Sequence, residues 1–307
     1  MHVILTGIDR SGKSYLAKEL SKNLYLPVVN KLCPKNNIFI ECVDFLVDTP
    51  IPTIVDRFHI DEQVYGPVLR GSSRFDFRQY RIIDLLMLMM DTVNIFCYDK
   101  AENVKERLKR SFERQLITES QVENILTRYQ DAMLESPLDW IPYTIGTDLS
   151  TIIDKVQVKL GSINQEQKRK FLRYRTLGKL TSKVLFVGDR YGDKLLPPLV
   201  PFGNNDPGLR LFQAIDQLQK VSWRNVLITN SIKLNGNGID HKQALVEECS
   251  LPSIEVIICL GNNAYENVCL TGIKKRIEKI PHPSAWFVYK NGSVDDYAMQ
   301  ISKAING

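Results

Sequence analysis

The chain has 307 residues, of which 44% are hydrophobic and 24% charged, and its formal net charge is +5. This length allows two domains with separate cores. The sequence holds no apolar run near the roughly 18 residues that cross a bilayer, and residues 1–20 carry charges where a signal peptide has an apolar core. These features exclude an integral membrane protein and predict a cytoplasmic globular protein without a membrane partner.

The cysteines are scattered, with neither a C-x-x-C pair nor a histidine at metal-ligand spacing. This pattern favours buried thiols over a zinc site or a disulfide framework. The six residues are Cys33, Cys42, Cys97, Cys249, Cys259 and Cys269.

The positive charge gathers in one short segment. Residues 161–180 hold six basic and one acidic side chain, whereas residues 1–160 hold 20 basic and 22 acidic side chains. The segment, which includes Lys168, Arg169, Lys170 and Arg173, either contacts a phosphate backbone or is a solvated linker.

The first half alternates strand-like and helical patterns. Residues 2–6 form an apolar run that ends before Gly7, and residues 15–24 have helical periodicity. Residues 85–90 are apolar all round, as in a helix buried against a sheet. Further strands are predicted at residues 37–42, 53–55, 93–98 and 143–145. The alternation predicts an α/β domain with a largely parallel sheet.

A second strand-loop-helix series follows the basic segment. It predicts strands at residues 183–187, 225–229, 255–260 and 286–289. We therefore expect two α/β domains, at residues 1–160 and 183–307, joined by a basic linker at residues 161–182.

The motif G-x-x-x-x-G-K-[ST] stands between the first strand and the first helix. In this phosphate-binding loop, or P-loop, backbone N–H groups surround phosphate oxygens, Lys13 reaches the β- and γ-phosphates and Ser14 binds Mg²⁺. The alternative is a glycine-rich turn without a ligand. The loop predicts binding of ATP and Mg²⁺ by Gly7, Asp9, Arg10, Ser11, Gly12, Lys13 and Ser14.

An acid-base pair follows the strand predicted at residues 53–55, where α/β sheets present ligand-binding residues. Asp56 could hold Mg²⁺ through water or accept a proton, and Arg57 could clamp an anionic acceptor. A structural ion pair is the alternative. Together with the P-loop, the pair favours phosphoryl transfer.

These motifs, with Glu62-Gln63-Val64-Tyr65-Gly66, Arg70 and Arg74, make residues 1–160 resemble the thymidylate kinase and deoxynucleoside kinase group. The resemblance implies that Asp9 approaches the acceptor's sugar and that Arg57 and Arg74 approach its phosphate. It further implies a base pocket formed by Phe58 and Tyr65, with Arg70 among the substrate contacts. Arg107, Arg110 and Arg114 stand where such kinases carry an arginine lid, although a solvent-facing charged stripe is the alternative.

Several short motifs follow one another in residues 183–307. They are Gly188-Asp189-Arg190-Tyr191-Gly192-Asp193, Pro201-Phe202, Leu227-Ile228-Thr229-Asn230, residues 256–261 and Pro281-His282-Pro283-Ser284. Together they resemble the uracil-DNA glycosylase superfamily. The resemblance implies that Asp189 orients a water, Asn230 reads a base edge, and His282 with Ser284 contacts base or phosphate. Tyr191 and Phe202 would close over a flipped ring. Some members hold an iron–sulfur cluster, but this chain lacks the cysteine spacing, so no cluster is expected.

The two resemblances converge on thymine-like bases and leave three hypotheses open. The first is a kinase acting on a base within DNA, such as 5-hydroxymethyluracil in the DNA of some bacteriophages, in the host cytoplasm. The second is a deoxynucleoside-monophosphate kinase fused to a glycosylase-like module. The third is a DNA-repair or defence protein regulated by ATP. In each, the partner is DNA or a pyrimidine deoxynucleotide, and the second domain either cleaves a glycosidic bond or only binds.

Overall fold

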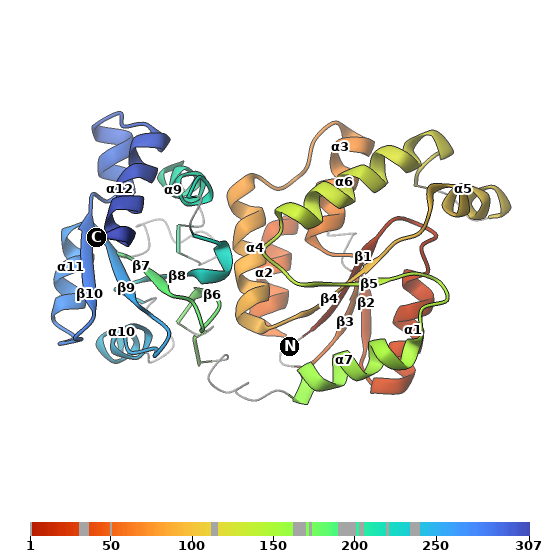
Figure 1. Ribbon diagram of the computed structural model, residues 1–307, viewed down its shortest axis with the longest axis horizontal. Coiled ribbons are helices and arrows are strands. Elements are labelled where there is room, and N and C mark those ends of the chain that lie inside the picture. Colours follow the sequence, from red (N-terminus) through yellow and green to blue (C-terminus); the bar gives the residue numbers. More distant parts are fainter. Residues whose placement is uncertain are drawn as a thin grey trace. The chain divides into compact units, whose positions relative to one another are not determined.

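The computed structural model describes residues 2–30, 37–49, 51–111, 116–161, 170–171, 174–189, 201–202, 206–218, 221–233 and 240–307. Its contacts divide the chain into two compact units. Unit 1 comprises Met1–Asp76 and Met90–Ile163, and unit 2 comprises Phe77–Met89 and Asn164–Gly307. Each unit contains a five-stranded sheet with flanking helices (Figure 1). The predicted architecture of two α/β units is therefore confirmed.

The sheet of unit 1 has the strand order β2-β3-β1-β4-β5, and all neighbouring strands are parallel. The carboxyl ends of its strands therefore meet at one edge, where α/β proteins bind ligands. The strands are β1 (Val3–Gly7), β2 (Val28–Asn30), β3 (Ile54–Asp56), β4 (Val93–Cys97) and β5 (Trp140–Tyr143).

Alternating side chains of β1 and β4 pack against α1 (Lys13–Leu24) and α7 (Leu149–Gly161). Val3 and Leu5 share a buried cluster with Leu16 and Leu20 of α1 and Ile152 of α7. The helical and strand periodicities in the sequence are consistent with this packing. The other helices of unit 1 are α2 (Ile38–Asp48), α3 (His59–Arg70), α5 (Ala101–Arg110), η1 (Glu119–Gln121) and α6 (Val122–Glu135).

The strand predicted at residues 37–42 is wrong, because this segment begins α2. The Asn37 side chain caps the helix by accepting hydrogen bonds from the N–H groups of Phe39 (3.0 Å) and Ile40 (3.4 Å). Buried Phe39, Cys42 and Val43 recur at helical spacing. The short apolar run with β-branched residues favoured a strand in the sequence, whereas the Asn37 cap stabilises the start of a helix.

The sheet of unit 2 has the order β10-β9-β7-β8-β6. Only β6, which lies in the segment predicted as a linker, is antiparallel to its neighbour; the other pairs are parallel. The strands are β6 (Leu177–Gly178), β7 (Val184–Gly188), β8 (Val226–Asn230), β9 (Val256–Leu260) and β10 (Arg276–Ile280).

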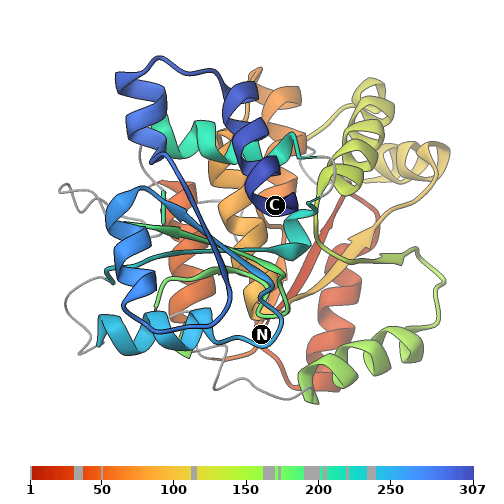
Figure 2. The same ribbon diagram turned by 60° about the vertical axis from the view of Figure 1, so that its left-hand side comes forward.

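Helices cover both faces of this second sheet. In Figure 2, α9 (Asp206–Asp216) and α12 (Val294–Asn306) lie on one face, and α10 (His241–Cys249) and α11 (Asn262–Cys269) lie on the other. The unit also contains η2 (Trp223–Asn225), η3 (Ala285–Tyr289) and most of α4 (Phe77–Met90). None of the described helices combines the length and apolar character needed to span a bilayer.

The predicted strand at residues 286–289 is also wrong, because these residues form η3, a π-helical turn. The last strand is instead β10, which pairs with β9 from Arg276 to Ile280. Its sequence, Arg-Ile-Glu-Lys-Ile, is largely charged, and only Ile280 is buried, as suits an edge strand with much of its surface toward solvent. The strand-like composition of residues 286–289 reflects burial of Phe287 rather than sheet pairing.

The first prediction concerns Gly7, where β1 lies close to β4. Its backbone has φ 139°, and an added Cβ would lie 1.9 Å from the carbonyl oxygen of Cys97. We expect Gly7→Ala to lower the free energy of unfolding of unit 1 by more than about 3 kcal/mol, since the strands must separate. Urea unfolding followed by circular dichroism measures this loss.

Gly146→Ala is the matched control. Gly146 also has a positive φ, of 101°, but no atom lies within 4 Å of its added Cβ. Gly146→Ala should therefore lower the free energy of unfolding by only about 1–2 kcal/mol, through backbone strain alone. Equal losses in the two variants would show that the close approach at Gly7 does not matter.

Candidate active site

The P-loop leads from the end of β1 into the start of α1. Gly7 and Gly12 both have positive φ, of 139° and 91°, which lets the chain turn without a Cβ clash. The Ser11 hydroxyl donates to the Ile8 carbonyl (2.7 Å) and so closes the turn. The loop predicted from sequence therefore has the strand-turn-helix setting that phosphate binding requires.

Lys13 lies inside this loop, with its side chain buried. Its Nζ donates to the carbonyl oxygens of Gly7 (2.6 Å) and Ile8 (2.8 Å). Burial lowers the pKa of Lys13, and Arg57 lowers it further, whereas Asp61 and Asp9 oppose the shift. The ammonium group is thus placed at the P-loop, where it can bind phosphate as a point charge.

Ser14 and Asp56 form the second feature of the site. The Ser14 hydroxyl donates to Asp56 Oδ2 at 3.4 Å. Within the described residues, Asp56 Oδ1 is buried without a hydrogen-bond partner. Burial raises the pKa of Asp56, against the opposing effect of Lys13 and Arg57. A hydroxyl beside an unsatisfied carboxylate oxygen fits a Mg²⁺ site, because Mg²⁺ prefers oxygen ligands.

Arg57 directly follows β3 and has a left-handed backbone, with φ 70°. Its guanidinium forms an ion pair with Asp9 and lies 5.6 Å from the centre of the Tyr65 ring. Burial opposes the charged form, but Asp9 raises the pKa of Arg57, which therefore stays protonated. Its buried NH1 group has no partner among the described residues and remains a donor for a ligand.

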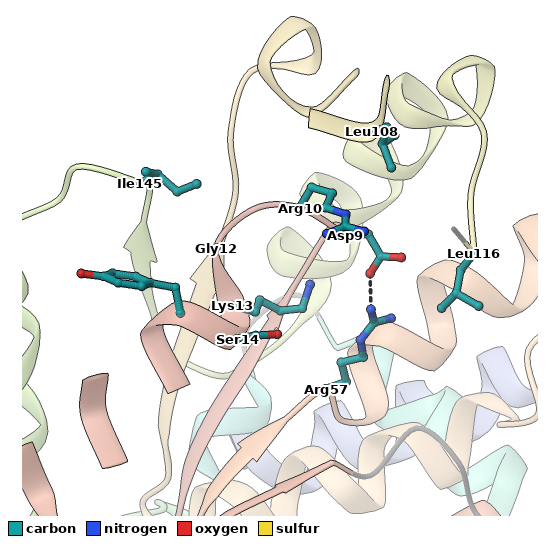
Figure 3. A pocket seen from close by; sticks show the side chains of 10 residues that line it. Asp9, Arg10, Gly12, Lys13, Ser14, Arg57, Leu108, Leu116 and Ile145 are labelled. Atoms are coloured by element: carbon teal, nitrogen blue, oxygen red, sulfur yellow. Dashed lines mark hydrogen bonds and ion pairs between the residues drawn. The ribbon is translucent and has the colours of Figure 1, made fainter. Parts of the chain in front are cut away.

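Lys13, Ser14 and Arg57 line a cavity of about 370 Å³ (Figure 3), and Asp56 lies behind Ser14 without lining it. Figure 3 shows Lys13 and Ser14 at the start of α1, and Asp9 joined to Arg57 beside them. Apolar side chains complete the wall, which suits a ligand with both phosphates and a ring. The lining residues are Asp9, Arg10, Gly12, Lys13, Ser14, Tyr15, Arg57, Leu108, Leu116 and Ile145.

The arginines predicted as a lid have different surroundings. Arg107 donates to the carbonyl oxygen of Arg10 (2.5 Å) and pairs with Asp99, so it supports the P-loop backbone. Arg110 pairs with Glu106 on the exposed side of α5, as in the predicted alternative of a charged stripe. Arg114 lies outside the described residues.

The aromatic residues predicted for a base pocket are buried in unit 1. Phe58 is 2% exposed and packs edge-on against Phe45. Tyr65 is 3% exposed, and its hydroxyl accepts a hydrogen bond from the N–H of Asp9 at 2.8 Å. In this structure both rings support the site from behind and do not line the cavity.

Arg70 and Arg74 meet at a buried carboxylate that the sequence reasoning missed. Both guanidinium groups pair with Glu62, and the backbone N–H of Arg74 also donates to it (3.0 Å). Although burial opposes ionisation, the arginine hydrogen bonds lower the pKa of Glu62. The acidic pair Asp61-Glu62 at the start of α3 was the available signal, since acidic residues are favoured in the first turn of a helix.

In unit 2, predicted residues gather at the carboxyl ends of β7 and β8. An added Cβ on Gly188 would lie 2.4 Å from Asn230 Oδ1 and 2.6 Å from Phe202 Cζ. The rings of Phe202 and His282 lie 6.4 Å apart. The next residue, Asp189, accepts a hydrogen bond from Asn263 (2.9 Å), which the sequence reasoning missed. The predicted residues Asp189, Phe202, Asn230 and His282 thus lie near one another at this edge of the sheet, although they are far apart in sequence.

His282 is a neutral donor in this cluster. Its Nδ1 accepts the N–H of Ser284 (3.1 Å), which leaves the proton on Nε2. Burial lowers the pKa of His282, with Asp189 opposing. Ser284 thus contributes to the cluster through its backbone, while Tyr191 lies outside the described residues.

The described part of the basic segment is anchored to α10. Lys170 pairs with Glu247 at 2.7 Å, and the Tyr174 hydroxyl donates to the same carboxylate at 2.9 Å. Lys170 is therefore already neutralised. Lys168, Arg169 and Arg173 lie outside the described residues.

No known protein-family model matches this chain, and no curated protein is significantly similar to it in sequence. Solved structures resemble its first half. YorR protein from Bacillus subtilis, in complex with phosphorylated GDP, has a TM-score of 0.45 and 23% identity over 53% of this chain and 100% of its own.

Two further structures are more distant. Deoxyadenosine kinase from M. mycoides, with products dCMP and dCDP bound, has a TM-score of 0.36 and 19% identity over 53% of this chain and 100% of its own. A gluconokinase from Sinorhizobium meliloti 1021 has a TM-score of 0.35 and 15% identity over 52% and 90%. Since these scores lie below 0.5, we infer function from the geometry of the site.

The second prediction concerns metal binding by Asp56. Asp56→Asn keeps the shape but removes the carboxylate charge, so the Mg²⁺ concentration needed for ATP to stabilise unit 1 should rise about tenfold or more. Thermal unfolding at fixed ATP and increasing MgCl₂ measures this shift. Asp48→Asn, an exposed change on α2, is the control. An unchanged Mg²⁺ midpoint would exclude Asp56 from the metal site.

Proposed function

We propose that unit 1 is an ATP- and Mg²⁺-dependent kinase whose acceptor is a hydroxyl group on a thymine-like deoxynucleotide, foremost 5-hydroxymethyluracil in DNA. The observation that supports this most is the buried Asp56 carboxylate, with one oxygen toward Ser14 and the other without a partner among the described residues, near Lys13 of the P-loop. A P-loop explains phosphate binding, and the extra carboxylate supplies what transfer to a hydroxyl needs.

The donor half follows from the P-loop. Lys13 would bind the β- and γ-phosphates, while Ser14 and Asp56 would hold the metal. Mg²⁺, when bound, neutralises charge on the phosphates during transfer. Arg107 keeps the P-loop backbone in place through the Arg10 carbonyl and need not touch the phosphates.

The acceptor half requires a proton acceptor. As the hydroxyl oxygen forms its bond to the γ-phosphorus, the bond to the β-phosphate oxygen breaks and ADP leaves. The hydroxyl proton must leave too, and Asp56 Oδ1 is the unpartnered base beside the P-loop. Asp56 Oδ1 is thus placed to take this proton at the P-loop.

The arginines argue against a free monophosphate as the preferred acceptor. Arg57 is paired with Asp9, and Arg70 and Arg74 share Glu62. Each of these guanidinium groups is already engaged by a carboxylate, whereas a dianionic monophosphate is best bound by arginines that are free to form bidentate contacts.

Unit 2 would bind the base or the DNA that carries it. The Asn230 amide offers a donor and an acceptor together, and neutral His282 offers an N–H group, which complements the carbonyl and imide groups of a thymine-like ring. Phe202 offers a surface on which the ring stacks.

The third prediction tests the acceptor. With γ-labelled ATP, label should pass to hydroxymethyluracil-containing DNA more efficiently than to 5-hydroxymethyl-dUMP, and dTMP should stay unlabelled. Lys13→Ala should lower transfer at least about a hundredfold for every acceptor, because it removes the charge at the transferring phosphate. Lys18→Ala, on the exposed side of α1, is the control.

Other outcomes would separate the alternatives. Label in mononucleotides alone would overturn the DNA acceptor in favour of a monophosphate kinase. Full activity of Lys13→Ala would overturn the P-loop assignment.

The fourth prediction tests unit 2. Asn230→Ala should weaken binding of a hydroxymethyluracil-containing oligonucleotide about tenfold or more, because a two-point contact to a base edge is lost. Fluorescence anisotropy measures this change, and Asn306→Ala, an exposed change near the end of α12, is the control. Alkali-labile sites in DNA after incubation would show that the unit cleaves glycosidic bonds instead of only binding. If Asn230→Ala and Asn306→Ala bound the oligonucleotide with equal affinity, Asn230 would be excluded from the base-binding site.

A further inference from the structure

Asp61 is a fully buried carboxylate, with 0% exposure, in the first turn of α3. Both of its oxygens accept hydrogen bonds. Oδ2 accepts from the Thr6 hydroxyl (2.6 Å) and the Phe58 N–H (2.9 Å), and Oδ1 accepts from the Tyr129 hydroxyl (2.6 Å) and the Gly7 N–H (3.3 Å). All four donors are uncharged, so a buried acidic side chain is satisfied here without a direct ion pair.

Three of the four donors belong to the segments that build the candidate active site. Thr6 and Gly7 end β1 at the P-loop, and Phe58 directly follows the Asp56-Arg57 pair. One carboxylate therefore connects the P-loop to the turn that carries the metal and proton-accepting side chain. These segments are about 50 residues apart in sequence, and no strand pairing joins the residues beyond Asp56 to the loop.

The backbone of Gly7 is bonded on both sides of its Cα. The N–H of the Thr6–Gly7 peptide donates to Asp61, and the carbonyl oxygen of the Gly7–Ile8 peptide accepts from Lys13 Nζ (2.6 Å) and lies 2.9 Å from the Tyr129 hydroxyl. Lys13 and Tyr129 therefore meet at one carbonyl oxygen, while Asp61 contacts both the preceding N–H and the Tyr129 hydroxyl. The position of the Gly7 carbonyl thus helps to decide where the Lys13 ammonium lies.

Tyr129 comes from α6, which packs alongside α3 (Figure 1). Its side chain is fully buried, and its ring lies 6.2 Å from that of Tyr65 and 5.5 Å from that of Phe96. Tyr65 in turn accepts the Asp9 N–H. The hydroxyl of Tyr129 is therefore fixed by packing, as a group that orients others must be.

We propose that Asp61 and Tyr129 are positioning residues for phosphoryl transfer, which together hold the Gly7 peptide and the Asp56–Phe58 turn in the arrangement that places Lys13 and Asp56 for reaction. The inference rests on the proposed kinase function for its kinetic effect, whereas its effect on nucleotide binding holds independently. Neither residue touches the cavity, so both act through others.

The fifth prediction uses Asp61→Asn, Tyr129→Phe and the double variant. In Asp61→Asn, an amide NH₂ group, which cannot accept a hydrogen bond, replaces one of the two accepting oxygens. Tyr129→Phe removes only the hydroxyl group. We expect each single change to raise the Kd for Mg-ADP about tenfold and to lower kcat about tenfold to a hundredfold, since misplacement by 1 Å has effects of that order. The KM for the acceptor should rise less than the Kd for Mg-ADP, because the acceptor also contacts groups outside the turn that Asp61 holds.

The double variant identifies a shared mechanism. If both residues act through one hydrogen-bonded unit, the double variant should lose no more than the worse single variant. Thr92→Val is the control, because it removes a buried hydrogen bond to Asn94 (2.8 Å) before β4, at the sheet end away from the P-loop. It should leave Kd and kcat unchanged even where it lowers the unfolding temperature.

Three outcomes would overturn the positioning role. They are a wild-type Kd for Mg-ADP in both single variants, losses that multiply in the double variant, or losses that merely follow the unfolded fraction seen by circular dichroism. Failure of the wild-type protein to phosphorylate any acceptor would instead overturn the kinase proposal. In that case the Kd values for Mg-ADP would still test the positioning role.

Discussion

The site depends on the peptide of Gly7, where β1 comes so close to β4 that any side chain would strike the Cys97 carbonyl. This approach makes the chain leave the sheet in a positive-φ turn, and the turn exposes the Gly7 and Ile8 carbonyls to Lys13. The position of the ammonium group therefore follows from a backbone constraint rather than from the lysine side chain, which is flexible by itself.

The same region concentrates buried charges, and their pairing indicates which group is available for chemistry. Arg57 is matched by Asp9, and Asp61 is satisfied by four neutral donors. Asp56 alone among these acidic groups keeps a buried oxygen without a partner in the described part of the chain. Since an unsatisfied buried carboxylate is costly, it is expected to persist where a metal ion or a proton completes it.

How far the sequence predicts the site depends on how local each interaction is. The P-loop could be predicted because its residues are consecutive and the strand-turn-helix pattern surrounds them. Asn230 and His282 were named only from the uracil-DNA glycosylase resemblance, since the strand before His282, β10, has a largely charged sequence and was not predicted. The role of Tyr129 could not be predicted, since its bond to Asp61 spans 68 residues and depends on how α6 packs. Tyr65 looked like a pocket residue by pattern, but its hydroxyl serves the Asp9 backbone. The helix at residues 38–48 was missed because one capping side chain, Asn37, outweighs its strand-like composition.

The two sheet edges differ in the ligand groups that they suit. The edge of unit 1 carries Lys13, Arg57 and Asp56, which are charged groups that match phosphates and a metal ion. The edge of unit 2 gathers an amide, a neutral imidazole and an aromatic ring, with Asp189 held by Asn263, and these match an uncharged planar base. A nucleotide in DNA presents both a base and phosphates, whereas a free nucleoside leaves the charged edge without an acceptor phosphate. The chemistry of the two edges therefore matches a nucleotide, which carries both groups, better than it matches a free nucleoside.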